Sequence, residues 1–562
     1  MTTLRWLTAG ESHGPMLVAT IEGLPAGLAL DDDALSVDLA RRQRGYGRGG
    51  RMKIERDRAR IVAGVRHGRS LGGPVALLLE NRDHESWRTR MKVAALTEGE
   101  DPGARVTLPR PGHADLAGAI KYERDDLRDV LERASARETA ARVALGGIAK
   151  ALLRAVGVRV GSAVVSIHEA RSRDLSTLCP EGRFDAEEIS ARADVSEVRA
   201  LDAEAEMIAA IREAMARRDT VGGVVEVVVS GLPPGVGSFV HADRRLDARL
   251  MGALASVQAI KAVEVGDGWR GATRYGTEVH DPITRAGTAI ARASNHAGGT
   301  EGGVSNGEPL VMRAAMKPIA TVSNALPSVD LATGEIDRAH VERSDTCAVP
   351  AAAVVCEAMA ALCVADALLE TWGADTVDQL RARVREAWRR ARRLPGHVYL
   401  CGLSGAGKST VAKLLSRAME LPVIDLDAEI ERASGASVRD LFSREGEPSF
   451  RARELDALRS VARGPRAVIA LGGGAVLSAE ARDILRRSGD VVWLRAPVSA
   501  LAARLSHATD RPLLDGDLTA SLTALDAVRR DVYELVSDVI VDATAAPDEV
   551  TQRALGALGA MR

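Results

Sequence analysis

The sequence predicts an α/β protein in two parts: an α+β part, followed by a parallel sheet with helices on both faces. The 562 residues exceed what one hydrophobic core usually organises, so two or more domains are expected. Strand and helix patterns alternate from residue 397 to 562, as they do in parallel sheets. The apolar run Val398–Cys401 leads into the turn GLSGAGKS and then a helical pattern, the context of a phosphate-binding loop.

The composition narrows the class of protein. Hydrophobic residues make up 46% of the chain, and the net charge of −2 gives no basic excess that would suggest nucleic acid. The cysteines form no C-x-x-C pair, which fits a reducing compartment and argues against a disulfide or zinc framework. They are Cys179, Cys347, Cys356, Cys363 and Cys401. Neither a signal-peptide pattern nor an apolar stretch of about 18 residues is seen, so we expect a cytoplasmic protein without a membrane segment.

The first part mixes strands, loops and helices. Strands are expected at residues 17–21, within 60–82, at 158–167 and at 224–230. Helices are expected at 127–155, around 185–218, at 246–262 and at 375–394, and a strongly apolar helix is expected beyond Asp345. Residues 83–112 have the polar, Pro- and Gly-containing composition of a loop.

Four features of this part suggest chemistry. The arginine- and glycine-rich segment Arg41–Asp57 is interpreted either as a solvated basic loop or as a mobile clamp for an anion. His113 follows Pro-Gly and so belongs to a turn. Asp345 precedes the apolar helix, where it would act as a helix cap or as a base. The glycine-dense residues 294–308 suit a loop against a flat ligand, or a surface linker.

Seven segments, in order over residues 1–390, together resemble chorismate synthase. They are GESHG (10–14), RRQRGYGRGGRM (41–52), RPGHAD (110–115), RASARETAAR (133–142), NHAGGTEGGVSNGE (295–308), KPIAT (317–321) and RSDTCAVPA (343–351). The resemblance implies a β-α-β sandwich domain that eliminates phosphate from 5-enolpyruvylshikimate 3-phosphate (EPSP). It also implies a requirement for reduced FMN, with NADPH as a candidate reductant, and a homotetramer formed through this domain.

The same resemblance implies which residues are catalytic and which bind the substrate and FMN. His13 and His113 match the active-site histidines, one expected to serve the departing phosphate and the other the reduced flavin. Asp345 matches the carboxylate that works with flavin N5 in removing the ring proton. Arg42 and Arg48 match anion-binding arginines. The expected FMN contacts are Arg133, Ala134, Ser135, Gln258, Ala259, Gly302, Lys317, Pro318, Ile319, Ala320, Thr321 and Arg343.

The second part carries its polar residues where strands end. Strands are expected at 398–401, 422–425, 467–471, 490–494 and 539–541. The phosphate cradle is expected to comprise Gly405, Ala406, Gly407, Lys408, Ser409 and Thr410. Lys408 can reach the terminal phosphates of ATP, and the Ser409 hydroxyl can ligate Mg²⁺.

The order D-L-D (425–427), F-R-x-x-E (450–454), GGG (472–474) and R-P-L-L (511–514) resembles shikimate kinase. The resemblance implies that Asp427 orients the attacking 3-hydroxyl of shikimate and that Arg511 covers the ATP phosphates from a lid at 507–516. Substrate residues are expected to be Asp427, Arg451, Gly473 and Arg529. Arg530 remains an alternative to Arg529, because a shift by one residue would exchange them.

Together these features predict a bifunctional enzyme of the shikimate pathway. The expected division is a synthase domain at 1–390, a linker at 391–397 and a kinase domain at 398–562. The expected partners are small molecules, EPSP and shikimate, with no nucleic acid and no membrane. Two alternatives stay open: the second part phosphorylates another small carboxylated polyol, or one part is a scaffold for the other.

Overall fold

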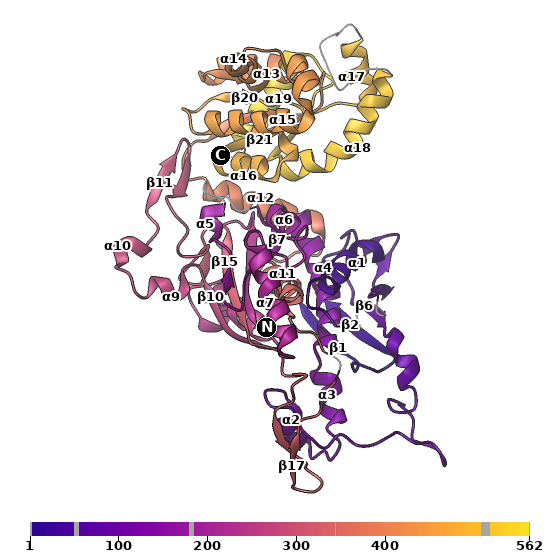
Figure 1. The fold of residues 1–562 in the computed structure, drawn as a ribbon. Coiled ribbons are helices and arrows are strands. Elements are labelled where there is room, and N and C mark those ends of the chain that lie inside the picture. Colours follow the sequence, from indigo (N-terminus) through magenta and orange to yellow (C-terminus); the bar gives the residue numbers. More distant parts are fainter. Residues whose placement is uncertain (1–2, 50–55, 179–184, 343, 507–516, 561–562) are drawn as a thin grey trace. The chain divides into compact units, whose positions relative to one another are not determined.

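The computed structural model describes residues 3–49, 56–178, 185–342, 344–506 and 517–560 (Figure 1). The chain divides into two compact units, one made of residues 1–280 and 295–380 and the other of 281–294 and 381–562. Residues 281–294 and 381–390 therefore pack with the second unit, although the sequence division places them in the first domain. The limits at residues 390 and 397 stay a proposal.

The two largest sheets in the described part of the first unit are antiparallel. One has the order β1 (Arg5–Ala9), β2 (Met16–Glu22), β6 (Val75–Glu80) and β3 (Arg60–Ala63); the other has the order β10 (Ile260–Val265), β15 (Leu310–Met316), β9 (Gly223–Ser230), β7 (Arg159–Ile167) and β8 (Ala170–Arg171). Helices α4 (Thr139–Ala155) and α11 (Val349–Trp372) pack against each other, α4 on β2 and α11 on β7 and β9. This sheet–helix–sheet order confirms the predicted sandwich.

In the first sheet, every second side chain of β2 and β6 is buried. Leu17, Ala19 and Ile21 of β2 are fully buried and lie opposite Leu79, Leu77 and Val75 of β6. Successive strand residues point to opposite faces, so these pairs share the face that meets the helices. Helix α11 is mostly apolar, and although it is long and apolar enough to cross a membrane, 94% of its most apolar stretch is buried inside the unit. Such a helix is typical of a protein core.

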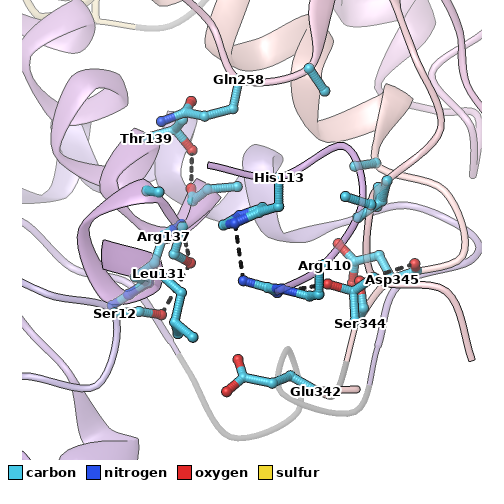
Figure 2. Close-up of a pocket in the computed structure, with 18 of the residues that line it drawn as sticks. Ser12, Arg110, His113, Leu131, Arg137, Thr139, Gln258, Glu342, Ser344 and Asp345 are labelled. Carbon is cyan, nitrogen blue, oxygen red and sulfur yellow. Dashed lines mark hydrogen bonds between the residues drawn. The ribbon is translucent and has the colours of Figure 1, made fainter. Parts of the chain in front are cut away.

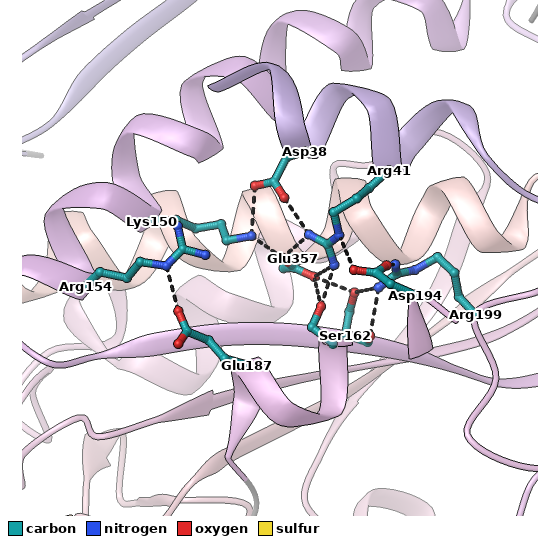
Figure 3. A network of polar contacts seen from close by, with 10 residues as sticks. Asp38, Arg41, Lys150, Arg154, Ser162, Glu187, Asp194, Arg199 and Glu357 are labelled. Carbon is teal, nitrogen blue, oxygen red and sulfur yellow. Dashed lines mark hydrogen bonds and ion pairs between the residues drawn. The ribbon is translucent and has the colours of Figure 1, made fainter. Parts of the chain in front are cut away.

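A buried charge network joins the helical layer to the second sheet (Figure 3). Glu357 of α11 accepts hydrogen bonds from Arg41 Nη1 at 2.8 Å and from Ser162 Oγ of β7 at 2.7 Å. Lys150 of α4 also contacts Glu357 and donates to Asp38 of α1 (Asp32–Gln43) at 2.8 Å. Burial opposes the charge on Glu357, but Lys150 and Arg41 hold the pKa of its carboxyl well below the usual range. The network ties four elements together.

Two predicted helices are wrong in extent. The expected helix 127–155 is three elements, α3 (Arg128–Ala134), η3 (Ala136–Glu138) and α4, because Ser135 is extended and its hydroxyl accepts from Arg137 N. The expected helix 246–262 is α8 (Leu246–Ala255) followed by β10. The chain turns between them at Ala259, whose φ is +67°, so that β10 can pair with β15.

The remaining elements of the first unit are short or peripheral. The expected helical segment 185–218 is α6 (Ala186–Ala193) and α7 (Glu204–Ala216). The others are β4 (Val65–Arg66), β5 (Arg69–Ser70), η2 (Arg82–Trp87), α2 (Asp115–Tyr122), α5 (Leu175–Leu178), η4 (Ala242–Arg244), α9 (Gly268–Gly271), α10 (Gly276–Val279), β13 (Thr300–Glu301), β14 (Val304–Ser305), β16 (Pro327–Val329) and β17 (Ile336–Arg338).

The second unit has a parallel sheet of order β19 (Val423–Asp425), β20 (Val468–Ala470), β18 (His397–Cys401), β21 (Gly489–Arg495) and β22 (Val539–Asp542). All five predicted strands are thus confirmed. The helices are α13 (Lys408–Met419), α14 (Leu426–Ser434), α15 (Val438–Ala462), α16 (Ala479–Ser488), α17 (Val498–Leu505), α18 (Leu518–Val536) and α19 (Pro547–Ala560), with η5 at Ala475–Leu477. Helix α15 is kinked at Gly446, and the motif F-R-x-x-E (450–454) lies in its second half.

Two segments that precede the sheet in the sequence belong to this unit, residues 281–294 and the residues from 381 up to β18. The hairpin of β11 (Ile283–Ala286) and β12 (Ala289–Arg292) places the buried Thr288 hydroxyl 2.6 Å from the Ser488 carbonyl oxygen. Helix α12 (Val377–Ala391) matches the helix expected at 375–394, and its Arg385 donates to the carbonyl oxygens of Glu534 and Ser537. Arg385 thus binds carbonyl oxygens at the C-terminal end of helix α18.

Candidate active sites

The first unit contains a cavity of about 610 Å³ (Figure 2). Its walls come from the β1–β2 loop, the turn before α2, the break between α3 and α4, the turn before β10, the segment after β15 and the start of α11. These are loops and element ends held by the two sheets and the helical layer. A rigid frame with a site on its connections is the usual arrangement for binding residues.

His13 lies in the cavity wall and is held by Glu132 of α3. Its Nδ1 is 2.8 Å from Glu132 Oε1, and its backbone N–H donates to Glu132 Oε2 at 2.8 Å. Arg128, one turn earlier on α3, donates to the same carboxylate at 2.9 Å. The imidazole stacks on Trp87, with ring centroids 4.0 Å apart. The contact with Glu132 therefore fixes the direction of Nδ1, and the stacking on Trp87 fixes the plane of the imidazole ring.

His113 is held in the same way. Its Nδ1 is 2.5 Å from Asp115 Oδ1, and Arg110 Nε donates to Asp115 Oδ2 at 2.8 Å. Figure 2 shows Arg110 beside His113, and Arg110 Nη2 is 3.1 Å from His113 Nδ1. Burial works against the charge on Asp115, but His113 and Arg110 keep the pKa of its carboxyl well below the ordinary value.

Asp345 is bound to the arginine-rich segment. Its Oδ1 accepts from Gly49 N at 2.6 Å, and Oδ2 pairs with Arg48 Nη1 at 2.7 Å. The N-cap of α11 is Ala348, so the interpretation of Asp345 as the helix cap is wrong. Its carboxylate instead lines the cavity.

Arginines on α1 and η3 form one charged wall. Arg42 is 5% exposed and donates to Thr139 Oγ1 and to the Ala136 carbonyl oxygen. Arg137 pairs with the buried Asp57 at 2.5 Å. Burial, together with Arg48 and Arg137, lowers the pKa of Arg42 to about 10, although Asp57 opposes the shift. A solvated basic loop is therefore the wrong interpretation for Arg42 and Arg48, which are packed side chains; residues 50–55 of that segment lie outside the described part.

Positive charge predominates in the cavity wall. Among the described residues, seven arginine and lysine side chains line it: Arg42, Arg48, Arg90, Arg110, Arg128, Arg137 and Lys317. The acidic ones are Glu342 and Asp345. Burial would raise the pKa of Glu342, but His340, Arg128 and Arg110 hold it at about 2. A wall with this balance suits a ligand with several negative groups.

The second unit builds a phosphate-binding loop between β18 and α13. Gly405 and Gly407 have φ of +81° and +90°, which β-carbon-bearing residues rarely adopt. Helix α13 begins at Lys408, whose ammonium donates to the carbonyl oxygens of Gly402 and Leu403 at 3.0 and 3.2 Å. Ser409 Oγ donates to Asp425 Oδ2 at 2.6 Å. The loop thus places a lysine and a hydroxyl–carboxylate pair at a helix N-terminus.

The glycine turn after β20 gathers the predicted substrate residues. A β-carbon at Gly472 would fall 2.8 Å from Asp427 Oδ1, and one at Gly474 would fall 2.2 Å from Arg451 Nη1. A β-carbon at Gly473 would lie 3.1 Å from Arg529 Nη1. These side chains come from α14, α15 and α18, and they converge only because the turn lacks side chains of its own.

A buried carboxylate supports this cluster. Glu454 is 2% exposed, and its Oε2 pairs with Arg451 Nη1 at 2.6 Å. Burial, with a contribution from Asp427, raises the pKa of Glu454 even though Arg451 opposes the shift. Tyr533 donates to the Gly473 carbonyl oxygen at 2.5 Å, which fixes the turn.

Residues 4–369 match the family model for chorismate synthase. The chain belongs to the chorismate synthase family. It is 54% identical over 388 residues to the chorismate synthase of Trichlorobacter lovleyi, covering 67% of this chain and 97% of that protein. It is 53% identical over 389 residues to that of Thermobifida fusca, covering 68% and 98%. A solved structure, "Crystal Structure of Chorismate Synthase", has a TM-score of 0.55 at 40% identity and covers 69% of this chain and 98% of its own.

Residues 404–558 match the family model for shikimate kinase. A shikimate kinase from Acinetobacter baumannii, solved in complex with shikimate, is 32% identical, covers 30% of this chain and 97% of its own, and has a TM-score of 0.29. Both predicted resemblances are confirmed. The chain is a bifunctional enzyme of the shikimate pathway, a fusion of a chorismate synthase and a shikimate kinase, and both families act on small molecules.

The structure brings most predicted synthase residues to one cavity. His13, His113, Asp345, Arg42 and Arg48 line it. So do eight of the expected FMN contacts: Ala134, Ser135, Gln258, Ala259, Lys317, Ile319, Ala320 and Thr321. Arg133, Gly302 and Pro318 are not in its wall, and Arg343 lies outside the described residues. Arg133 is turned to the backbone oxygens of Thr8 and Gly10.

The cavity wall fits a flat ring with polar edges. Ala134, Ala259 and Ala320 leave room, and Gln258 Oε1 is a buried acceptor without a hydrogen-bond partner in the described structure. A ring N–H would satisfy it. Lys317 Nζ donates to the Gly112 carbonyl oxygen at 2.8 Å, and burial lowers the pKa of this ammonium. These features of the wall fit a flavin, the kind of cofactor that the chorismate synthase family generally uses.

In the kinase part, Arg529 and Arg530 differ in their surroundings. Arg529 is 4% exposed and faces the glycine turn. Arg530 is exposed and pairs with Asp526. Ala406, Thr410 and the rest of the expected cradle lie in the loop and first turn of α13. Arg511 and the expected lid at 507–516 lie outside the described residues.

Sequence reasoning missed several residues of both sites. Glu132, Asp115 and Trp87 hold the two histidines, and Glu454 holds Arg451. Asp115 had a local signal, an acid two residues after the histidine. Trp87 stood in a segment interpreted only as polar loop, and its partner is distant in sequence.

Proposed function

We propose that the synthase part eliminates phosphate from EPSP to give chorismate, and that the kinase part transfers the terminal phosphate of ATP to the 3-hydroxyl of shikimate. The observation that carries the first proposal is the cavity wall with seven basic side chains and two carboxylate-bound histidines. EPSP carries two carboxylates and one phosphate, and arginines bind such groups bidentately.

In the synthase reaction, different residues of this chain bind the anionic groups of EPSP and transfer protons. Arg42, Arg48 and Arg137 bind the anionic groups. Each histidine uses Nδ1 to bind a carboxylate, so its Nε2 is the ring atom left to exchange a proton with a ligand. Asp345 accepts the ring proton, and Gly49 and Arg48 keep it in place. Reduced FMN, when bound, supplies the electron-rich ring that this elimination requires without net redox change.

The kinase work rests on the phosphate-binding loop and the glycine turn. Lys408 and the backbone N–H groups of the loop bind the phosphates of ATP, and Ser409 ligates Mg²⁺. Asp427 orients the 3-hydroxyl, while Arg451 and Arg529 bind the carboxylate of shikimate. Arg511 covers the transferred phosphate. The protein works in the cytoplasm as a homotetramer joined through its synthase part, with domain limits at 1–390, 391–397 and 398–562.

One pair of assays tests these assignments. Anaerobic turnover of EPSP with FMN is followed by chorismate formation, with dithionite or NADPH as the reductant. ATP turnover is measured with shikimate and with other carboxylated polyols such as gluconate. We expect chorismate with dithionite and a strong preference for shikimate. Absence of chorismate under reduced FMN contradicts the synthase assignment, and equal turnover of gluconate contradicts the kinase substrate.

A further inference from the structure

Two copies of one side-chain arrangement occur in the synthase cavity. In each, an arginine binds a buried carboxylate that in turn binds the Nδ1 of a histidine. The first is Arg128–Glu132–His13, with distances of 2.9 and 2.8 Å. The second is Arg110–Asp115–His113, with distances of 2.8 and 2.5 Å. The two arrangements come from different elements and share no residue.

Both carboxylates act as acceptors. Glu132 receives hydrogen bonds from His13 N, from His13 Nδ1 and from Arg128, and it is 2% exposed. Asp115 receives them from Arg110 N, from Arg110 Nε and from His113 Nδ1, and it is 1% exposed. Because a carboxylate surrounded by such donors has no proton of its own to give, each Nδ1 must carry the hydrogen. Both rings are therefore fixed in the tautomer whose Nε2 accepts a proton.

Other groups around the two imidazole rings also help to fix the orientation of these rings. His84 contacts the His13 carbonyl oxygen at 2.9 Å, and Arg128 lies over Trp87, on which His13 stacks. Near His113, Lys317 binds the Gly112 carbonyl oxygen and Arg110 binds Thr321. Arg110 Nη2 also lies 3.1 Å from His113 Nδ1, but a guanidinium can only donate, so Asp115 at 2.5 Å is the acceptor for the Nδ1 hydrogen of His113, as Glu132 is for that of His13.

We infer that Glu132 and Asp115 are positioning residues of the synthase reaction: they hold the Nδ1–H of His13 and His113, so that Nε2 of each ring is the atom that binds and gives up the exchanged proton, and they stabilise the imidazolium form. The inference rests on the proposed elimination from EPSP. A carboxylate behind a histidine that exchanges protons sets its tautomer and supports its positive form, so replacing it with an amide slows the proton step more than it weakens substrate binding.

The test uses the full chain with Glu132→Gln and Asp115→Asn. Asp129→Asn, on the same helix α3 and 58% exposed, is the matched control. Initial rates of chorismate formation with reduced FMN give kcat and KM for EPSP over a range of pH. Shikimate kinase activity of the same polypeptide reports whether the chain is intact, and circular dichroism reports whether the synthase part is folded.

We expect kcat to fall at least about tenfold in each amide variant, with KM changed much less. The limb of the pH profile that reports the imidazoles should move to lower pH, since loss of the carboxylate removes a group that stabilises the imidazolium. Asp129→Asn should match wild type. If kcat and the pH profile of both amide variants match those of Asp129→Asn, the inference is wrong.

If an amide variant does not fold, variants that retain the negative charge test the inference instead. Glu132→Asp and Asp115→Glu keep the charge but displace it by one methylene, so we expect reduced kcat with folding retained, and unchanged kcat would overturn the inference. Wild-type protein that makes no chorismate from EPSP under these conditions would overturn the proposed function, and this inference with it. Active wild type with unaffected variants would overturn the inference alone.

Discussion

Gly146 of helix α4 lies directly against Ala358 of helix α11: a β-carbon at Gly146 would fall 2.3 Å from the Ala358 β-carbon and 2.6 Å from its Cα. The two helices form the central layer of the synthase part, so their separation sets the distance between the sheets. Close approach of this kind admits only glycine on one side.

Gly146→Ala should therefore destabilise the synthase part. Overpacking a close core contact costs about 1–3 kcal/mol or more. The matched control is Gly147→Ala, whose β-carbon would meet the Leu35 side chain at 3.0 Å, a group that can move aside. Urea unfolding of both variants measures the difference. Equal stability of the two would show that the helices can separate without loss.

Arg529→Lys should weaken shikimate binding, and Arg530→Lys should not. Arg529 is buried against the glycine turn, whereas Arg530 is paired with Asp526 at the surface. Lysine keeps the charge but lacks the fork that binds a carboxylate through two bonds. We expect the KM for shikimate to rise roughly 10- to 100-fold in the first variant. A larger effect at Arg530 would reverse the assignment.

Lys408→Ala and His113→Ala should separate the two activities. Loss of the loop lysine removes charge stabilisation at the transferred phosphate and should lower kinase turnover by about 100-fold or more. Loss of the imidazole should lower chorismate formation by about 100-fold or more. Each variant should retain the other activity, as measured in parallel on one preparation. Loss of both activities in a folded variant would contradict independent sites.

Glu342 should give the synthase part a pH-dependent stability. Its pKa falls from 4.5 to about 2 on folding, so its contribution is present above pH 4.5 and is lost as pH falls through the folded value. Glu342→Gln should cost at most about 3 kcal/mol at pH 7, because a tenfold change in proton affinity corresponds to about 1.4 kcal/mol.

Urea unfolding at pH 7, 5 and 3.5 checks the Glu342 prediction. The gap between wild type and Glu342→Gln should narrow at the lowest pH. Glu335→Gln, at an exposed turn, is the control. A gap that stays constant with pH would mean that the glutamate acts through packing rather than through its charge.

Local signals in the sequence account for what could be predicted. The strand–glycine loop–helix pattern at Lys408 and the five strands of the kinase part depend on residues close to one another along the chain. His13, His113 and Asp345 could be located because each stands in a short motif, and the structure brings all three to one cavity.

Features that depend on distant partners could not be predicted. Glu132 lies 119 residues from His13, and nothing in its own neighbourhood marks it as a ligand of that ring. The burial of Arg42 depends on Ala136 and Thr139. The helix expected at 127–155 breaks because Ser135 binds Arg137 N, a competition between side chain and backbone that hydrophobic periodicity does not register.

The hairpin of β11 and β12 has a consequence for synthesis on the ribosome. It belongs to the second unit, yet residues 295–380 of the first unit follow it in the chain. At typical translation rates, roughly 10–40 s separate the emergence of Thr288 from that of Ser488, which lies 200 residues later in the chain. Thr288 must wait over that interval for Ser488, so the kinase part can complete its folding only after the nascent chain has already delivered the whole synthase part.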